Sequence, residues 1–191
     1  MNKRVKLLTY TAMFAVLNYA VFTFGKINIP ISEGSTTAIH VANAVVVLSG
    51  WFLGPIYGGL AGAIGLSIAD FLDPRYIASA PKTFFLKFMI AFLAGTAAKK
   101  LGMTTENDRH RLIVSASFSA ALGLGFNVIF DPVIGYLYKR YILRVPAEAA
   151  SIILAWSAGV TMFNAAVCLI LSVVLYLALY KTMRGRIPYG K

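Results

Sequence analysis

The chain has little charge and very few acidic residues. Only 13% of its 191 residues are charged, and 7 Asp and Glu stand against 18 Lys and Arg. Apolar residues make up 59%, and the mean hydropathy is +0.74, well above the roughly 45–50% apolar usage of soluble domains. Because a spanning helix takes about 20 apolar residues, we expect one transmembrane domain over residues 1–191 and no soluble ATPase, kinase or nucleic-acid module.

The sequence also lacks the motifs of common enzyme and metal sites. It has one cysteine, Cys168, so it forms no intrachain disulfide and no cysteine metal cluster. No phosphate-binding loop, zinc-protease motif or nucleophile elbow is present. We therefore expect no catalytic residues, no metal and no cofactor, and a protein that binds or conducts a solute without hydrolysing ATP itself.

Apolar runs predict six helices, which break at glycines, prolines and charged residues. The predicted helices cover 5–24, 38–53, 56–72, 82–98, 112–137 and 147–180. The segment 26–37 reads as an extended loop, in which Pro30 and Gly34 prevent helix formation. The predicted fold is therefore all-α, an integral membrane bundle of six transmembrane helices.

The basic residues predict the orientation of this bundle. Six spans put both termini on one side of the membrane, and that side carries eleven Lys and Arg against six on the other. The positive-inside rule then places both termini in the cytoplasm and the segments 26–37, 73–81 and 138–147 outside. The net charge of +11 is explained by this bias and by lipid headgroups, so we expect no nucleic-acid partner.

The fifth predicted helix carries a polar ridge. Small and polar residues recur every four positions along it, at Ser115, Ser119, Gly123, Asn127 and Asp131. An asparagine and a carboxylate inside a span are costly in lipid and face a cavity or a partner helix. The ridge therefore predicts either a substrate site or hydrogen bonds that hold the bundle together.

Lys87 is the one basic residue placed inside a predicted span. A lysine at the centre of a span costs about 2.5–3.5 kcal/mol on insertion scales, so it needs a carboxylate, an anionic substrate or a path to the interface. Asp70 and Asp131 are the partners at a matching depth. A structural ion pair and a substrate contact are both open interpretations.

Further polar residues cluster toward the predicted outer ends of the helices. His40 and Asn43 are three apart and share a face of the second helix, whereas Asn164 and Trp156 lie on the sixth. Trp156 is either a stacking surface or an interfacial anchor. The candidate substrate-binding residues are His40, Asn43, Asp70, Lys82, Lys87, Asn127, Asp131 and Asn164.

Small residues at four-residue spacing mark the first and third helices. Gly58 and Gly62 continue a row that starts at Gly54, and Thr11 and Ala15 form a pair with Ala12 beside them. Such residues let two helix backbones approach closely. The pattern indicates either tight internal packing or a surface for a partner.

Three stretches resemble the substrate-binding S components of energy-coupling-factor (ECF) vitamin transporters. These are TAIHVANAVVVL at 37–48, GPIYGGLAGAIG at 54–65, and APKTFFLK at 80–87 with LAG at 93–95. The basic N-terminus and the TAMFA opening at 11–15 fit the same class. The pattern is similar to the branch that holds riboflavin, hydroxymethylpyrimidine and pyridoxine S components.

The resemblance implies a high-affinity vitamin binder in the plasma membrane of a prokaryote. It implies a pocket between the outer halves of helices four to six, with the loop after helix one as a lid. Partners would be a transmembrane coupling subunit and two ATPase subunits. The favoured ligand is hydroxymethylpyrimidine or a B6 vitamer, and riboflavin, pantothenate, folate and cobalamin are alternatives.

The first helix is expected to contact the coupling subunit, although it departs from the class pattern. The class usually shows alanines four apart there, whereas here Ala12 is followed by Val16. The predicted coupling residues are Thr11, Ala12, Ala15, Gly58 and Gly62.

Two other functions remain open from the sequence. A membrane scaffold protein would use the glycine-rich helix to bind another span. A proton-coupled carrier would use Asp70 or Asp131 for proton exchange, although the chain shows no repeated half of the kind many carriers have.

Overall fold

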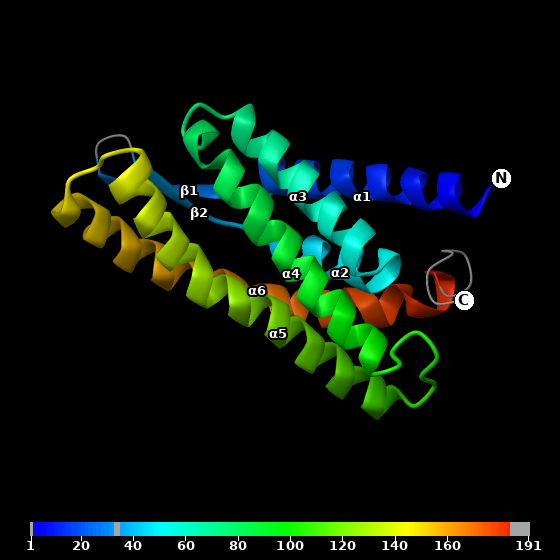
Figure 1. Ribbon diagram of the computed structural model, residues 1–191. Helices are drawn as coiled ribbons and strands as arrows, with labels where there is room; N and C mark the ends of the chain where they lie inside the picture. The colour runs from blue at the N-terminus through cyan, green and yellow to red at the C-terminus, as the bar shows by residue number, and fades with distance from the viewer. Residues whose placement is uncertain (1, 33–34, 184–191) are drawn as a thin grey trace.

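The computed structural model describes residues 2–32 and 35–183, so the predicted loop residue Gly34 lies outside the described residues. Helices dominate it, with one hairpin between the first two (Figure 1). The elements are α1 (Lys3–Gly25), β1 (Ile27–Ser32), β2 (Ser35–Ile39), α2 (Ala42–Leu53), α3 (Pro55–Phe71), a 3₁₀ turn (Ile77–Ser79), α4 (Ala80–Lys100), α5 (Arg109–Leu137), a π turn (Tyr138–Ile142) and α6 (Ala147–Met183).

Four of the six helices are long and apolar enough to cross a membrane: α1, α4, α5 and α6. At 1.5 Å per residue, the 12 residues of α2 and the 17 of α3 extend about 18 and 26 Å, less than the roughly 30 Å hydrocarbon core. The prediction of six full spans is therefore confirmed for four helices, while α2 and α3 are shorter apolar helices.

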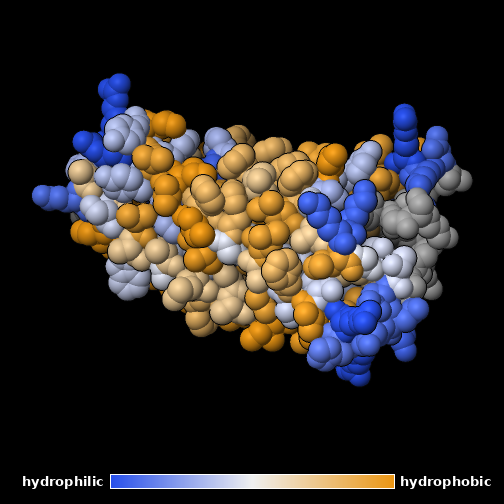
Figure 2. Space-filling view, turned by 60° about the horizontal axis from the view of Figure 1, so that its bottom comes forward, coloured by the Kyte–Doolittle hydropathy of each residue, from blue (hydrophilic) through white to orange (hydrophobic). Residues whose placement is uncertain are grey.

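The six helices nevertheless run back and forth between two ends of the bundle. The start of α1 and the end of α6 lie at one end with the α4–α5 loop, and the hairpin lies toward the other (Figure 1). On the face that Figure 2 shows, hydrophobic residues cover the middle and hydrophilic residues gather at both ends. This distribution suits a protein embedded in a bilayer.

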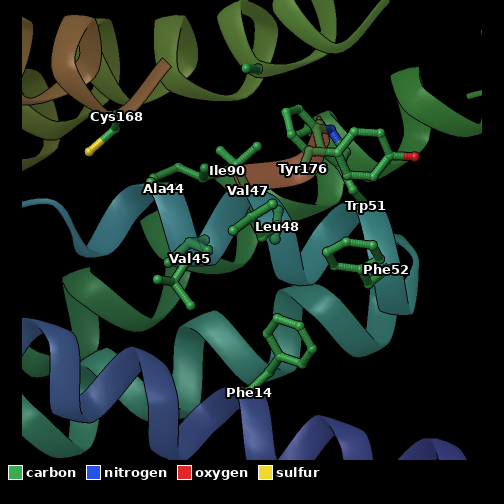
Figure 3. Packing of buried hydrophobic residues seen from close by; sticks show 14 of the residues in the cluster. Phe14, Ala44, Val45, Val47, Leu48, Trp51, Phe52, Ile90, Cys168 and Tyr176 are labelled. Carbon is green, nitrogen blue, oxygen red and sulfur yellow. The ribbon is translucent and has the colours of Figure 1, made fainter. Parts of the chain in front are cut away.

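The short helix α2 is the centre of the bundle. All twelve of its residues are buried, and it contacts each of the other five helices. Its side chains pack against Phe14, Ile90, Cys168 and Tyr176 from three neighbouring helices, α1, α4 and α6 (Figure 3). A helix that is apolar on every side has to be covered on every side, which explains why the shortest helix occupies the core.

Glycines allow the helices around α2 to approach closely. A Cβ at Gly58 would overlap the Ser49 carbonyl, and one at Gly62 would lie 2.8 Å from a methyl group of Val46. Both glycines are therefore buried in the contact between α2 and α3. This burial favours internal packing, one of the two interpretations of the row, for Gly58 and Gly62.

The segment predicted as an extended loop folds as a two-stranded antiparallel hairpin. Ile27 pairs with Ile39 and Ile29 with Thr37, and the register is irregular between Pro30 and Ser32. Proline has no N–H to donate to a strand ladder, so this position suits it. The hairpin brings β2 alongside α6, which it contacts.

We predict that Gly65→Ala lowers the stability of the bundle. A Cβ at Gly65 would overlap the Ala15 carbonyl and lie 2.9 Å from the Asn18 Cβ, so α1 and α3 would have to separate. We expect a loss of about 1–3 kcal/mol, measured by thermal unfolding in detergent.

Gly125→Ala is the matched control, because nothing lies within 4 Å of a Cβ built there. Since alanine is the better helix former by up to about 1 kcal/mol, this variant should be at least as stable as the unmodified protein. Equal stability of the two variants would show that α1 does not pack closely on α3.

Candidate functional site

A polar cavity of about 110 Å³ lies under the hairpin. Its wall contains residues of β2 and of every helix from α2 to α6, together with Phe22 from α1. All eight predicted substrate-binding residues line it: His40, Asn43, Asp70, Lys82, Lys87, Asn127, Asp131 and Asn164. We call this cavity the chamber.

An ion pair joins α4 to α5 at the chamber wall. Lys82 Nζ lies 2.8 Å from Asp131 Oδ1, and the Thr161 hydroxyl of α6 donates to Asp131 Oδ2 at 2.9 Å. A Cβ at Gly135 would come within 3.4 Å of Lys82 Nζ, so the absent side chain leaves the lysine room to lie beside α5. Both oxygens of Asp131 therefore have donors within the protein.

The carboxylates predicted as partners of Lys87 have other partners instead. The Asp70 carboxylate accepts a hydrogen bond from the Thr83 hydroxyl at 2.5 Å, and Asp131 pairs with Lys82. The buried Lys87 ammonium donates to Asn127 Oδ1 over 3.5 Å. Of the two interpretations left open for Lys87, the ion pair with Asp70 or Asp131 is not formed among the described residues, because Thr83 and Lys82 contact those carboxylates instead.

Near the start of α2, two buried side-chain atoms have no hydrogen-bond partner within the described ranges 2–32 and 35–183. These are His40 Nδ1 and Asn43 Oδ1. His40 packs edge-on against Phe22 with ring centroids 4.9 Å apart. Buried polar atoms nearly always have a partner, whether protein or water, so these two atoms point to something that fills the chamber.

Asn164 fastens the hairpin to α6. Its Oδ1 accepts from the His40 backbone N–H at 3.2 Å, and its Nδ2 donates to the Ala38 carbonyl at 2.9 Å. The Cys168 thiol contacts the His40 carbonyl at 3.7 Å. Asn164 lines the chamber, but both ends of its amide contact the backbone at the junction of β2 and α2.

A second cluster holds the start of the hairpin. Lys26 Nζ lies 2.8 Å from Asp73 and above the rings of Phe22 and Tyr76, at 4.5 and 4.8 Å from their centroids. The side chains of Arg75 and Lys26 hold the pKa of Asp73 below its usual range. Burial raises the pKa of Tyr76 to about 12, so this hydroxyl keeps its proton and donates to Asn28 at 2.8 Å.

The polar ridge of α5 makes helix contacts in one part and lines the chamber in another. Near one end, Ser119 accepts from the Trp51 indole at 2.9 Å and so connects α5 to α2. A Cβ at Gly123 would lie 3.2 Å from the Ala94 Cβ, which explains the close approach of α4. Asn127 and Asp131, further along, line the chamber.

Sequence reasoning missed several chamber residues. Thr83, Thr161, Tyr136 and Lys139 line the chamber, and the first two donate to its carboxylates. Thr83 lies one turn before Lys87 on the same face of the helix, so this spacing could have identified Thr83 as a chamber residue. Trp156 does not line the chamber, and its side chain is 52% exposed on the outer side of α6, which excludes the stacking role.

The chamber has the composition of a binding site for a small polar molecule. Among residues 2–32 and 35–183, no cluster of three or more His, Cys, Asp or Glu side chains is placed to hold a metal ion. Amides, lysines and carboxylates instead surround a space enclosed by apolar helices. Fold and site together define a membrane-embedded solute-binding protein.

Comparison with protein families identifies the class. The family model described as "ECF-type riboflavin transporter, S component" matches residues 2–181. The chain therefore belongs to this family of vitamin-binding transporter subunits, as the resemblance implied. Comparisons with curated proteins and with solved structures gave no match.

We predict that Asn127→Ala weakens ligand binding by about 1–3 kcal/mol, the usual cost of removing a partner from a buried polar group. The substitution takes away the acceptor of Lys87 and an amide of the chamber wall. Calorimetry on the detergent-solubilised protein measures the change.

Ser115→Ala, on the same ridge but outside the chamber, should leave affinity unchanged. If Asn127→Ala kept full affinity and only lowered the melting temperature, Asn127 would serve the bundle and not the ligand.

Proposed function

We propose that this chain captures a vitamin with a single heteroaromatic ring and delivers it to an ATP-driven ECF complex for uptake. Hydroxymethylpyrimidine and the B6 vitamers are the favoured ligands. The observation that carries the proposal is a chamber of about 110 Å³ with polar side chains from five helices, in which His40 Nδ1 and Asn43 Oδ1 lack partners.

The size of the chamber favours a small ligand. Sites for drug-sized molecules measure about 300–1,000 Å³, several times the volume found here. Riboflavin, the substrate in the family's name, has three fused rings and a ribityl chain. One six-membered ring with short substituents suits the volume better, and riboflavin remains the alternative.

The position of the chamber supports capture from outside the cell. Strand β2 lines the chamber, and the hairpin lies toward the end of the bundle opposite the start of α1 and the end of α6 (Figure 1). The excess of Lys and Arg on the side of the termini favours a cytoplasmic location for them in the plasma membrane of a prokaryote. The hairpin then covers the chamber from the outside and acts as its lid.

An apolar groove supports a coupling surface on the opposite flank of α3. Its volume is about 470 Å³. It is lined by Leu8, Thr11, Ala12, Ala15, Val16, Tyr19, Ile64, Gly65 and Ile68. The three predicted coupling residues of α1 lie in it, and the buried Gly65, which packs against Ala15, also lines it.

The direct test compares the chain alone with the complete complex. Purified protein is titrated with hydroxymethylpyrimidine, pyridoxine and riboflavin, and then reconstituted in liposomes with and without the coupling subunit and ATPases. We expect the chain alone to bind one of the two small vitamins without accumulating it, and the complex with ATP to accumulate it. Concentrative uptake by the chain alone would contradict the proposal.

We predict that Ala12→Trp abolishes uptake by the complete complex while ligand affinity of the isolated chain stays nearly intact. Ala12 is exposed and lines the groove, so an indole there would fill the space that a partner helix needs. Radiolabelled uptake and calorimetry give the two readouts.

Val174→Trp is the matched control, because Val174 is also exposed but lies on α6 outside the groove. It should reduce neither uptake nor affinity. If Ala12→Trp lowered affinity as much as uptake, the groove would not be a separate coupling surface.

A further inference from the structure

Lys87 is a buried lysine that forms no direct ion pair with a carboxylate among residues 2–32 and 35–183. It is 8% exposed and lines the chamber. Asp73 pairs with Lys26 and Arg75, and Asp131 pairs with Lys82. The hydrogen bond of Lys87 to Asn127 Oδ1 spans 3.5 Å, whereas a charged N–H donor usually lies about 2.7–2.9 Å from its acceptor. The ammonium group thus has a neutral partner at long range.

The acids of the chamber accept their hydrogen bonds from side chains other than Lys87. Asp131 accepts from Lys82 through one oxygen and from Thr161 through the other. Asp70 accepts from Thr83. A buried charge is stable only when it is paired and hydrogen-bonded. An anionic acceptor on a ligand would give Lys87 such a partner.

The α2 side of the chamber offers the opposite chemistry. Among residues 2–32 and 35–183, neither Asn43 Oδ1, a buried acceptor, nor the buried His40 Nδ1 has a hydrogen-bond partner. A ligand that satisfies both sides carries an anionic acceptor for α4 and an N–H or O–H donor for α2. Both requirements are met by a ring that carries an anionic oxygen at one position and an N–H or O–H donor at another.

We propose, on the basis of the function proposed above, that the ligand is bound through an anionic ring oxygen on Lys87, with a ring or hydroxyl donor toward Asn43. The 3-hydroxypyridines have this chemistry, because the hydroxyl proton can reside on the ring nitrogen and leave a phenolate and a pyridinium N–H. An aminopyrimidine of the same size has donors and neutral nitrogens but no anionic oxygen. The inference therefore selects the B6-type ring over the pyrimidine.

The test combines a ligand change with a protein change. Pyridoxine and 3-O-methylpyridoxine, in which the acidic hydroxyl is blocked, are titrated into the unmodified protein and into Lys87→Met. We expect blocking the hydroxyl to weaken binding to the unmodified protein at least about 30-fold, the scale of an unpaired buried charge. Lys87→Met should weaken pyridoxine binding to a similar degree and remove the difference between the two ligands.

Lys99→Met is the matched control, because Lys99 is an exposed lysine near the other end of α4. It should keep the full preference for pyridoxine. Equal binding of the two pyridoxines by the unmodified protein would overturn the inference, even if Lys87→Met did not fold. So would an unchanged preference in Lys87→Met.

The outcomes also separate this inference from the proposed function. Tight binding of hydroxymethylpyrimidine without pyridoxine would overturn the role of Lys87 and leave the proposed function intact. Tight binding of riboflavin, with neither small ring bound, would overturn both. Tight binding of pyridoxine that depends on its free hydroxyl and on Lys87 would support both.

Discussion

The structure depends on keeping a charged chamber inside an apolar bundle. Isolated charges are too costly in such surroundings, and so Lys82 and Asp131 lie 2.8 Å apart with Thr161 on the second carboxylate oxygen. Asp70 has Thr83 as its partner. These contacts join α4 to α5, α5 to α6 and α3 to α4, so the polar groups that line the chamber also hold its walls together.

The apolar centre and the polar chamber occupy different levels of the same helices. Close packing of α2 against α3 and α4 at Gly50, Gly58 and Gly95 draws the helices together away from the chamber. On α5, Gly123 in that packed region gives way one turn later to Asn127 and then to Asp131. Residues four apart on α5 thus contact α4 at Gly123 and line the chamber at Asn127 and Asp131.

The sequence predicted the helices and the membership of the chamber better than its internal contacts. Apolar runs and glycine or proline breaks place helices to within a few residues, and helical spacing identifies Asn127 and Asp131 as neighbours on one inward face. Spacing within a helix does not determine which side chains of another helix it contacts. For this reason Asp70 and Asp131, the carboxylates at a depth matching Lys87, contact Thr83 and Lys82 instead.

The sequence did not predict the strand pairing of the hairpin or the helix that packs on the glycine row. Pairing of Ile27 with Ile39 depends on how the chain returns from α1 to α2. Isoleucine does recur at every second position of the first strand, INIPIS, but the proline inside this run weakens a strand prediction, and the pattern does not identify the partner strand. The glycines at 58 and 62 predict that another helix packs closely on α3, but they do not identify that helix. In the structure that neighbour is α2, because the most apolar helix has to be covered on every side.

Asn164 and α3 each link the chamber to another part of the molecule. The amide of Asn164 holds the backbone of Ala38 and His40, so β2 ends next to the His40 ring, whose Nδ1 has no partner among the described residues. A ligand that bonded to this nitrogen would therefore also contact the residue at the end of β2. On α3, Asp70 lines the chamber and Gly65, five residues earlier, lines the groove against α1. A shift of this one helix alters both surfaces, which gives ligand binding a short physical route to the proposed coupling face.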